Sequence, residues 1–412
     1  MKRQLVAVPI LTCLLVAEIA LADQLPHIIL VMADDHGYGD TGFTGHPFVR
    51  TPHLDAMSEA GVVFNRFYAS APVCSPTRAS VMTGRHPFRA NVPNHGHYMR
   101  PHETTIAEAL KHAGYVTGHF GKWHLGHVPG RVPTDQGFDE WWSAGNWYDI
   151  GHEYIYHNGE QVPPRDGDTS DVLMDVALEW IGRQAKTDKP FLALIWFPSP
   201  HGPFEAKEKY TKPYLQYGEK KANYYGELAG VDHAMGRLRR ALRDMRIADN
   251  TMLWFNSDNG GYGPATDMDP LWGYKGNYYE GGIRVPFFVH WPGVVAPGGS
   301  SAEPVIGVDV YPTLLDIAGA QRPDQPLDGV SLLPLLRGEV ASLPRRPLFW
   351  HFPAYLQSYR TSVLEQPDHL GPGQGIRHRV GRAVQADDAA APADRAEVAA
   401  AQAKVRVDPL RE

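Results

Sequence analysis

Four short runs in this chain are predicted to be β-strands, and each is followed by polar or charged residues. The runs lie at 27–32, 115–120, 191–197 and 251–256, and the polar clusters that follow them are Asp34–Asp35, Lys122–His124, His201 and Asp258–Asn259. The apolar runs at 27–32 and 191–197 are typical of strands buried on both faces of a parallel sheet. Because the carboxyl ends of parallel strands meet at one edge of a sheet, we expect the four clusters to lie together.

Helical segments separate these runs along the chain. The segment Thr104–Ala113 begins with a capping box, in which Glu108 follows Thr105 by three residues, and it ends at Gly114. Further helices are predicted at 171–183, 219–246 and 308–318. Alternating strands and helices predict an α/β fold with a large, mainly parallel (mixed) sheet sandwiched by helices.

The N-terminal residues have the composition of an export signal. Lys2 and Arg3 precede an apolar stretch, and Ala20 and Ala22 frame a small-x-small cleavage site. A membrane anchor is the weaker interpretation, because the stretch is short of the roughly 20 residues that a span needs. We therefore expect a signal peptide at 1–22, an exported protein that is periplasmic or secreted, and no stable membrane span after cleavage.

The mature chain would be globular and mildly acidic. The 412 residues are 43% hydrophobic and carry a net charge of −7, which argues against nucleic acid as a partner. The sequence predicts a catalytic domain at 23–356 and an atypical, weakly structured segment at 357–412, where the chain becomes Pro/Gly-rich and then Ala-rich.

Cys74 would be the only cysteine left after cleavage, since the other, Cys13, lies in the signal peptide. A buried thiol acting as a small hydrophobe is the simplest interpretation. However, Cys74 stands just before a helix predicted at Pro76–Thr83, and Arg78 follows one turn later. A helix N-terminus and a guanidinium both favour an anion, so a thiolate nucleophile is a second interpretation.

Oxygen ligands gather at two of the strand ends. Asp34 and Asp35 alone are best explained as a turn or helix cap, but Asp258 and Asn259 follow a second strand. Three carboxylates and an amide oxygen suit Ca²⁺ or Mg²⁺ better than Zn²⁺.

Four basic side chains complete the candidate site. They are Lys122, His124, His201 and Lys275. Each alone is better explained as a surface or satisfied core group. Together they could bind a tetrahedral anion and protonate a leaving oxygen.

These motifs, from Pro26 to Pro353, resemble those of the type I sulfatases, an arylsulfatase-like family of the alkaline-phosphatase-like superfamily. The matching segments are Cys74–Arg78, which fits the signature Cys-x-Pro-x-Arg, together with Thr83–Arg85, Gly121–Gly126, Asp34–Gly37, Ser257–Gly260, Asp309–Asp316 and Leu327–Ser331. The resemblance implies an alkaline-phosphatase-like fold. It also implies that the usual small C-terminal α+β domain is truncated or altered, because the chain changes character after Pro353.

The resemblance further implies a chemistry. A formylglycine-generating enzyme would convert Cys74 to formylglycine, whose hydrate attacks sulfur and then expels sulfate. The metal would be Ca²⁺, and the side chains implied to hold it are Asp34, Asp35, modified Cys74, Asp258 and Asn259. The roles implied for the remaining residues are orientation of the hydrate by Arg78, sulfate binding by Lys122, His201 and Lys275, base action by His124, and protonation of the leaving alcohol by His201. The substrates would be sulfated carbohydrates or aryl sulfate esters.

Two other functions remain open on the sequence. One is a phosphoester or phosphonate hydrolase of the same superfamily, which metal content would reveal. The other is an inactive sulfoglycan-binding protein, which would bind without turnover.

Aromatic and histidine motifs outside the signatures suggest minor roles. His95 and His97 are better explained by a loop or substrate rim than by a second metal. Trp141–Trp142 and Trp147–Tyr148 could form a sugar platform, and core packing is at least as favoured.

Overall fold

The structure is a computed structural model that describes residues 24–144, 155–163, 165–262, 266–267, 270–352, 360–364 and 378–382. The predicted signal peptide and Trp147–Tyr148 lie outside these residues. The chain divides into two compact units, Met1–Pro344 and Arg345–Glu412.

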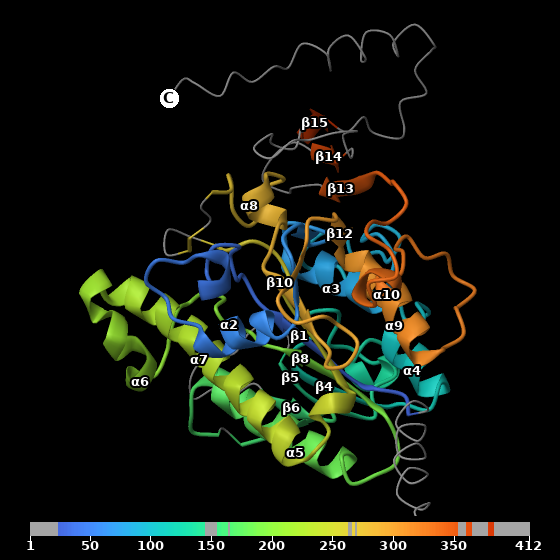
Figure 1. The fold of residues 1–412 in the computed structure, drawn as a ribbon, viewed down its shortest axis with the longest axis horizontal. Helices are drawn as coiled ribbons and strands as arrows, with labels where there is room; N and C mark the ends of the chain where they lie inside the picture. Colours follow the sequence, from blue (N-terminus) through green and yellow to red (C-terminus); the bar gives the residue numbers. More distant parts are fainter. Residues whose placement is uncertain are drawn as a thin grey trace, which may run out of the picture. The chain divides into compact units, whose positions relative to one another are not determined.

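A ten-stranded sheet forms the centre of the first unit (Figure 1). In spatial order its strands are β11 (Gly299–Ser301), β2 (Val62–Phe64), β10 (Phe287–His290), β9 (Thr251–Ser257), β1 (His27–Ala33), β8 (Phe191–Trp196), β4 (Val116–Lys122), β5 (Glu140–Ala144), β6 (Tyr156–His157) and β7 (Glu160–Gln161). The five strands from β9 to β5 are parallel. β10 is antiparallel to both of its neighbours, so the sheet is mixed. This confirms the predicted large, mainly parallel sheet.

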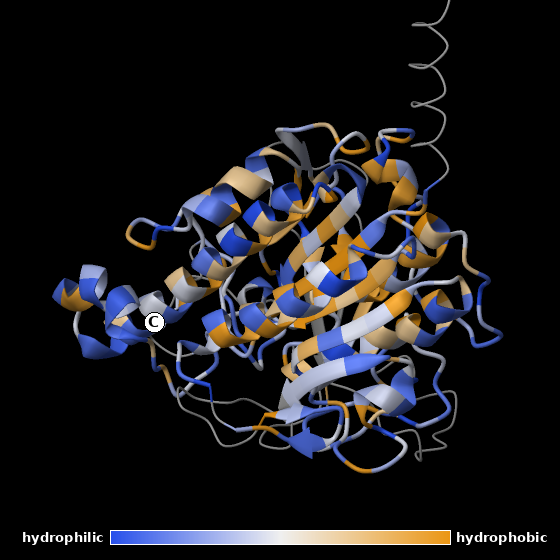
Figure 2. Cartoon of the chain, turned by 90° about the horizontal axis from the view of Figure 1, so that it is seen from below, coloured by the Kyte–Doolittle hydropathy of each residue, from blue (hydrophilic) through white to orange (hydrophobic). Residues whose placement is uncertain are grey.

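Helices cover both faces of this sheet, because the central strands are apolar on both sides. Ile29 and Val31 of β1 belong to the core beneath α2 (Pro52–Glu59), α5 (Thr169–Gln184) and α7 (Glu219–Asp244). Ile28 and Leu30 belong to the opposite core, beneath α3 (Cys74–Thr83), α4 (Ile106–His112), α9 (Val310–Ala318) and α10 (Leu333–Leu336). The hydrophobic colour of the central strands is visible in Figure 2.

The N-terminus of α4 has the capping box that its sequence predicts. The Thr105 hydroxyl accepts a hydrogen bond from the Glu108 backbone N–H, and the Glu108 carboxylate accepts one from the Thr105 N–H. Together they satisfy two donors that the first turn of a helix leaves unpaired. Gly114, with a φ of 94°, follows the helix and turns the chain into β4.

Short elements connect these layers. They are η1 (Gly42–Thr44), β3 (Phe67–Tyr68), η2 (Pro133–Gln136), α6 (Glu208–Thr211), η3 (Lys212–Tyr217), η4 (Ala248–Asn250), α8 (Glu280–Ile283), β12 (Val305–Ile306) and η5 (Gly307–Asp309). A search of the described helices finds none with the length and apolarity needed to cross a membrane.

The second unit contains a three-stranded antiparallel sheet of β13 (Leu348–Phe352), β14 (Arg360–Leu364) and β15 (His378–Arg382). Two of its strands fall within 357–412, the segment for which the sequence predicts weak structure. The rest of that segment lies outside the described residues.

Candidate active site

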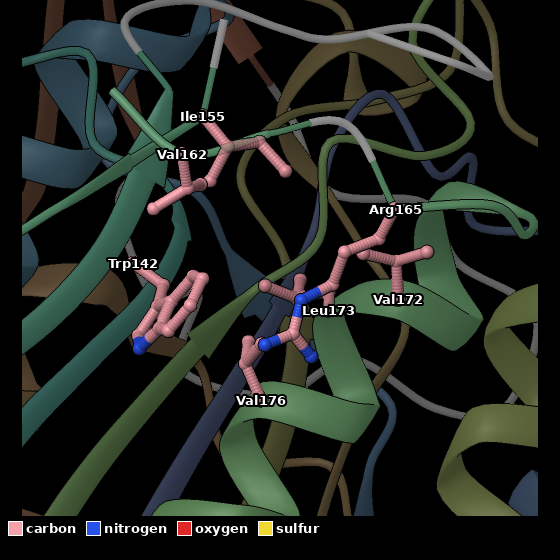
Figure 3. A pocket seen from close by; sticks show the side chains of 7 residues that line it. All are labelled: Trp142, Ile155, Val162, Arg165, Val172, Leu173 and Val176. Atoms are coloured by element: carbon pink, nitrogen blue, oxygen red, sulfur yellow. The ribbon is translucent and has the colours of Figure 1, made fainter. Parts of the chain in front are cut away.

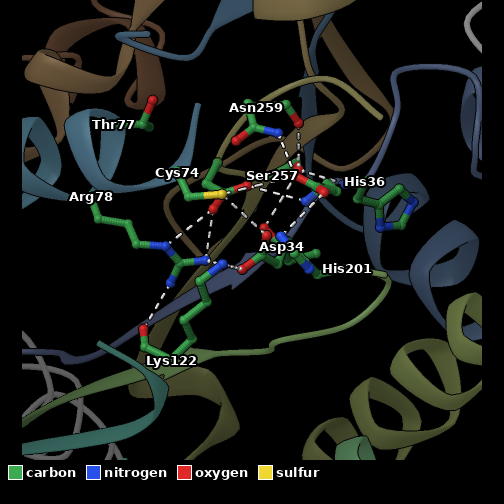
Figure 4. A network of polar contacts seen from close by, with 12 residues as sticks. Asp34, His36, Cys74, Thr77, Arg78, Lys122, His201, Ser257 and Asn259 are labelled. Carbon is green, nitrogen blue, oxygen red and sulfur yellow. Dashed lines mark hydrogen bonds and ion pairs between the residues drawn. The ribbon is translucent and has the colours of Figure 1, made fainter. Parts of the chain in front are cut away.

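The carboxyl ends of β1 and β9 bring the acidic residues together, as predicted. The Asp258 backbone N–H donates to the Ala33 carbonyl oxygen at 3.1 Å, and the Asp35 N–H donates to Asp258 Oδ1 at 3.2 Å. Asp35 has a φ of 60°, so the backbone turns sharply there. Asn259 Nδ2 donates to Asp35 Oδ1 at 2.7 Å. Asp34, Asp35 and Asp258 are all buried at these strand ends, and Figure 4 shows Asp34 and Asn259 within the network of polar contacts there.

Cys74 is the first residue of α3 and is fully buried. Its Sγ lies 3.5 Å from Asp34 Oδ1 and 3.9 Å from Asp35 Oδ1. Burial, together with the carboxylates of Asp258 and Asp34, raises the pKa of the Cys74 thiol. The unmodified side chain is therefore held as a neutral thiol, and the thiolate interpretation is disfavoured.

Arg78 lies one turn further along α3 and is also fully buried. Its guanidinium donates to Asp258 Oδ2 at 2.7 and 3.1 Å, to Asp34 Oδ2 at 2.9 Å and to the Lys122 carbonyl oxygen at 2.8 Å. Burial alone would raise the pKa of Asp34, but Lys122 and Arg78 outweigh it and the pKa is lowered. Arg78 thus ties three strand ends together through one rigid fork.

Two lysines approach the same carboxylates from different elements. Lys122, the last residue of β4, forms an ion pair with Asp34 Oδ2. Lys275, from the loop before α8, lies 2.8 Å from both oxygens of Asp35. Burial opposes ionisation of Asp35, yet Lys275 and His201 lower its pKa below the ordinary value. Three cations therefore balance the three carboxylates, and the cluster has a net charge near zero.

The histidines lie at the rim of this cluster. His201 Nε2 is 3.7 Å from Asp35 Oδ2, and its Nδ1 bonds with the Gly202 carbonyl oxygen at 2.7 Å. The His124 ring stacks on the His95 ring, with centroids 5.6 Å apart and 21° between the planes. Burial, with Lys122 and Arg78 nearby, lowers the pKa of His124 well below its usual value, so its imidazole is neutral.

The donor set fits a hard cation. Ligand atoms of Asp34, Asp35, Cys74 and His201 all lie within 4.8 Å of one another. The buried Asn259 Oδ1 accepts no hydrogen bond from any described residue, while its Nδ2 faces Asp35; a half-turn of the amide would present the oxygen to a cation. Carboxylate and amide oxygens are the ligands that Ca²⁺ prefers. His201 was expected at this edge of the sheet as a sulfate-binding residue, but its place within this group of candidate metal-ligating atoms was not predicted.

The structure brings nine of the ten predicted residues into one network of hydrogen bonds and ion pairs. The tenth, His124, adjoins the network through its electrostatic interaction with Lys122 and Arg78. Ser257 belongs to a motif that the sequence matches, but no role was predicted for it. Its Oγ accepts from the His36 N–H at 3.0 Å and donates to the Asn259 carbonyl oxygen at 2.9 Å, which fixes the turn after β9. The sequence feature that could have indicated this role is its position directly after the strand predicted at 251–256 and directly before Asp258.

The Trp141–Trp142 pair packs into the protein. Trp141 is buried, and the Trp142 ring stacks on His157 with centroids 4.3 Å apart. The Arg165 guanidinium lies 4.9 Å from the Trp142 ring centre, within a small apolar pocket beside α5 (Figure 3). With its ring contacted in this way, Trp142 is a packing residue. Neither His95 nor His97 belongs to a metal-binding group among the described residues.

The fold and this cluster together define an enzyme of the alkaline-phosphatase-like superfamily, with cationic and carboxylate side chains gathered at the carboxyl ends of parallel strands. Residues 26–320 match the family model described as Sulfatase. The chain belongs to the sulfatase family, and it is a sulfuric ester hydrolase.

Individual relatives agree with this assignment. N-acetylgalactosamine-6-sulfatase of Canis lupus familiaris is 32% identical over 373 residues, covering 80% of this chain and 69% of the relative. Arylsulfatase A of Homo sapiens is 32% identical, covering 84% and 74%. The crystal structure of Ps i-CgsB in complex with k-i-k-neocarrahexaose superposes with a TM-score of 0.79 at 29% identity, covering 86% of each chain. The phosphonate monoester hydrolase of Agrobacterium radiobacter shares the fold, with a TM-score of 0.62 at 22% identity, covering 92% and 95%.

Proposed function

We propose that this chain is an exported, Ca²⁺-dependent sulfatase that hydrolyses sulfate esters of sulfated sugars through formylglycine at position 74. The observation that carries the proposal is the position of Cys74 at the start of α3, with Sγ beside Asp34 and Asp35. A thiolate there would face two carboxylates, whereas the neutral hydrate of an aldehyde would not. When formed, the formylglycine hydrate supplies the hydroxyl that attacks sulfur.

Calcium is the metal that the site's oxygen ligands favour. Asp34, Asp35, Asp258 and Asn259 would hold it together with the modified Cys74. When bound, Ca²⁺ polarises a sulfate oxygen and lowers the pKa of a nearby hydroxyl. The side chains of the cluster balance one another in charge, with three carboxylates against Arg78 and two lysines. The ion's two positive charges would thus favour an anionic ester in the same pocket.

The remaining side chains would act on the ester and on protons. Lys122 and Lys275 would neutralise sulfate oxygens, and Arg78, fixed by three acceptors, would orient the nucleophile. His124 is neutral at neutral pH because of its burial, so it would accept a proton when sulfate leaves. His201, at the rim, would help to bind sulfate and to protonate the leaving alcohol.

Sulfated sugars are the substrate class that the relatives favour. The dog and human relatives are named for sulfatase activity, one of them on N-acetylgalactosamine 6-sulfate, and Ps i-CgsB was crystallised with a neocarrahexaose. Export to the periplasm or the cell exterior would rest on residues 1–22.

Sulfate release from 4-nitrophenyl sulfate tests the proposal. The chain would be coexpressed with a formylglycine-generating enzyme, assayed with Ca²⁺, and compared with Cys74→Ala. We expect turnover that the substitution abolishes, and a peptide mass showing conversion of Cys74.

Matched substrates separate the alternatives. Faster hydrolysis of 4-nitrophenyl phosphate or of a phenylphosphonate ester, with transition metals bound, would favour the phosphorus hydrolase. Binding of sulfated glycans without turnover, with Cys74 unmodified, would favour an inactive binding protein.

A further inference from the structure

Three exposed aromatic side chains lie on the segment that carries Lys275. Tyr262, Trp272 and Tyr274 are 52%, 74% and 54% exposed, and among the described residues Trp272 is the most exposed large hydrophobic side chain. Single exposed apolar residues are common on protein surfaces, but three large rings within one short segment are not. We call these three residues the aromatic platform.

Trp272 is held in place although its surface is exposed. Its ring contacts that of Tyr279 edge-on, with centroids 5.2 Å apart and 65° between the planes. Its carbonyl oxygen accepts a hydrogen bond from the Gly281 N–H at 2.8 Å. Gly273 next to it has a φ of 85°, and a Cβ there would lie 2.7 Å from the Tyr279 Cβ. Such a held ring presents a face without losing much side-chain entropy on binding.

The aromatic platform adjoins the candidate active site through Tyr262 and through the backbone next to Lys275. The Lys275 ammonium lies 5.7 Å from the Tyr262 ring centre and also pairs with Asp35. The Lys275 backbone N–H donates to the Gly261 carbonyl oxygen at 3.0 Å. Because Gly261 follows Asn259 by two residues, the platform is built directly onto the strand end that carries the expected metal ligands.

We propose that the aromatic platform binds the sugar units next to the sulfated one in an oligosaccharide or polysaccharide. Aromatic faces pack on the C–H faces of sugar rings. Tyr262 lies beside the Lys275 cation that would bind sulfate, and the exposed Trp272 and Tyr274 precede Lys275 by three residues and by one. This proposal rests on the proposed function, since it places the sulfate at Lys275. It deepens that function by assigning an extended sulfated glycan as the substrate, with neighbouring sugars adding affinity.

Calorimetric binding to the Cys74→Ala protein tests the platform without turnover. The probes are sulfated hexasaccharides of carrageenan, chondroitin sulfate and heparan sulfate type, each compared with its sulfated monosaccharide. We expect at least one hexasaccharide to bind more tightly than its monosaccharide. Adding Trp272→Ala should weaken that hexasaccharide at least about tenfold, or about 1.4 kcal/mol, with a much smaller change for the monosaccharide.

Matched variants keep this test decisive. Trp272→Phe retains a ring face and should recover most of the affinity, while Leu215→Ala, which removes another exposed apolar side chain, should have no effect. The platform is overturned if no hexasaccharide binds more tightly than its monosaccharide, or if Trp272→Ala weakens both equally. Turnover of 4-nitrophenyl sulfate by the unsubstituted enzyme is scored separately. Its absence would count against the proposed function, while the binding data would still judge the platform.

Discussion

The imidazole of His95 stacks on that of His124, with 5.6 Å between the ring centres and 21° between the planes. His124 adopts a φ of 57°, and its buried Nδ1 has no hydrogen-bond partner among the described residues. The stack with His95 is therefore one restraint on the orientation of the His124 ring.

Replacing His95 should impair catalysis through His124. We expect His95→Ala to lower kcat for 4-nitrophenyl sulfate about tenfold or more, because general-base catalysis depends on alignment. His95→Phe keeps a planar ring in the stack and should retain most of kcat. Equal losses in the two variants would show that the ring nitrogens of His95, rather than its face, matter.

Removing Arg78 should destabilise the whole first unit. The Arg78→Ala variant leaves Asp34 and Asp258 buried without their shared guanidinium, at a cost of about 3–5 kcal/mol. Arg78→Lys should also be destabilising, since an ammonium cannot reproduce the fork. Urea unfolding measures the effect, with the exposed Arg240→Ala as the control. Similar midpoints for Arg78→Ala and Arg240→Ala would contradict this account.

Lys275 should matter for activated esters as well as for sugars. We expect Lys275→Ala to lower kcat/KM for 4-nitrophenyl sulfate roughly 10²-fold, because it removes a fixed charge from the sulfate oxygens. The exposed Lys221→Ala serves as the control in the same assay. Unchanged turnover in Lys275→Ala would remove Lys275 from the site.

Calcium should stabilise the protein through Asn259. At free Ca²⁺ about 100 times its dissociation constant, the free energy of unfolding should rise by about 2.7 kcal/mol, and chelation should reverse this. Asn259→Ala should weaken the response, because the unpartnered amide oxygen is lost. A full Ca²⁺ response in Asn259→Ala would place the ion elsewhere.

Acid should weaken the fold in part through His27. Its ring stacks on Phe191, with centroids 4.2 Å apart, and its Nδ1 accepts a hydrogen bond from the Phe191 N–H at 3.3 Å. Burial lowers the pKa of His27 to about 4, from 6.5. The unfolded chain therefore takes up a proton below about pH 6.5 that the folded chain does not take up until about pH 4. The free energy of unfolding should thus fall as the pH is lowered from about 6.5 to about 4.

Unfolding by urea between pH 4 and 8 checks this expectation. His27→Phe keeps the stack and should flatten part of the decline, whereas His112→Phe removes an exposed imidazole and serves as the matched control. If the free energy of unfolding of His27→Phe falls with pH as steeply as that of the unsubstituted protein, the assignment to His27 is wrong.

Local chemistry explains which parts of the fold could be predicted from the sequence. The capping box at Thr105 and Glu108 depends on residues three apart, and the structure has it. The convergence of Asp34 with Asp258 follows from parallel strands, which bring their carboxyl ends to one edge. These features need no knowledge of distant packing.

Long-range pairing explains what the sequence left open. The apolar sequence of β10 does not indicate whether the strand runs parallel or antiparallel to its neighbours. Its antiparallel orientation is set by its pairing with β9 and β2. Likewise, Trp142 and Trp272 are the same residue type, and only the folded chain packs one beside Arg165 and exposes the other.

Cys74 has no exposed surface, and its backbone is already part of α3. Once that helix has packed, the active site of another protein has no route to Sγ. A maturation enzyme would therefore have to act while this segment is still extended, in the interval between its synthesis and the closing of the strand ends around it. The yield of mature enzyme would then depend on the rate of Cys74 conversion relative to the rate of folding. A variant that folds faster would leave more of its cysteine unconverted.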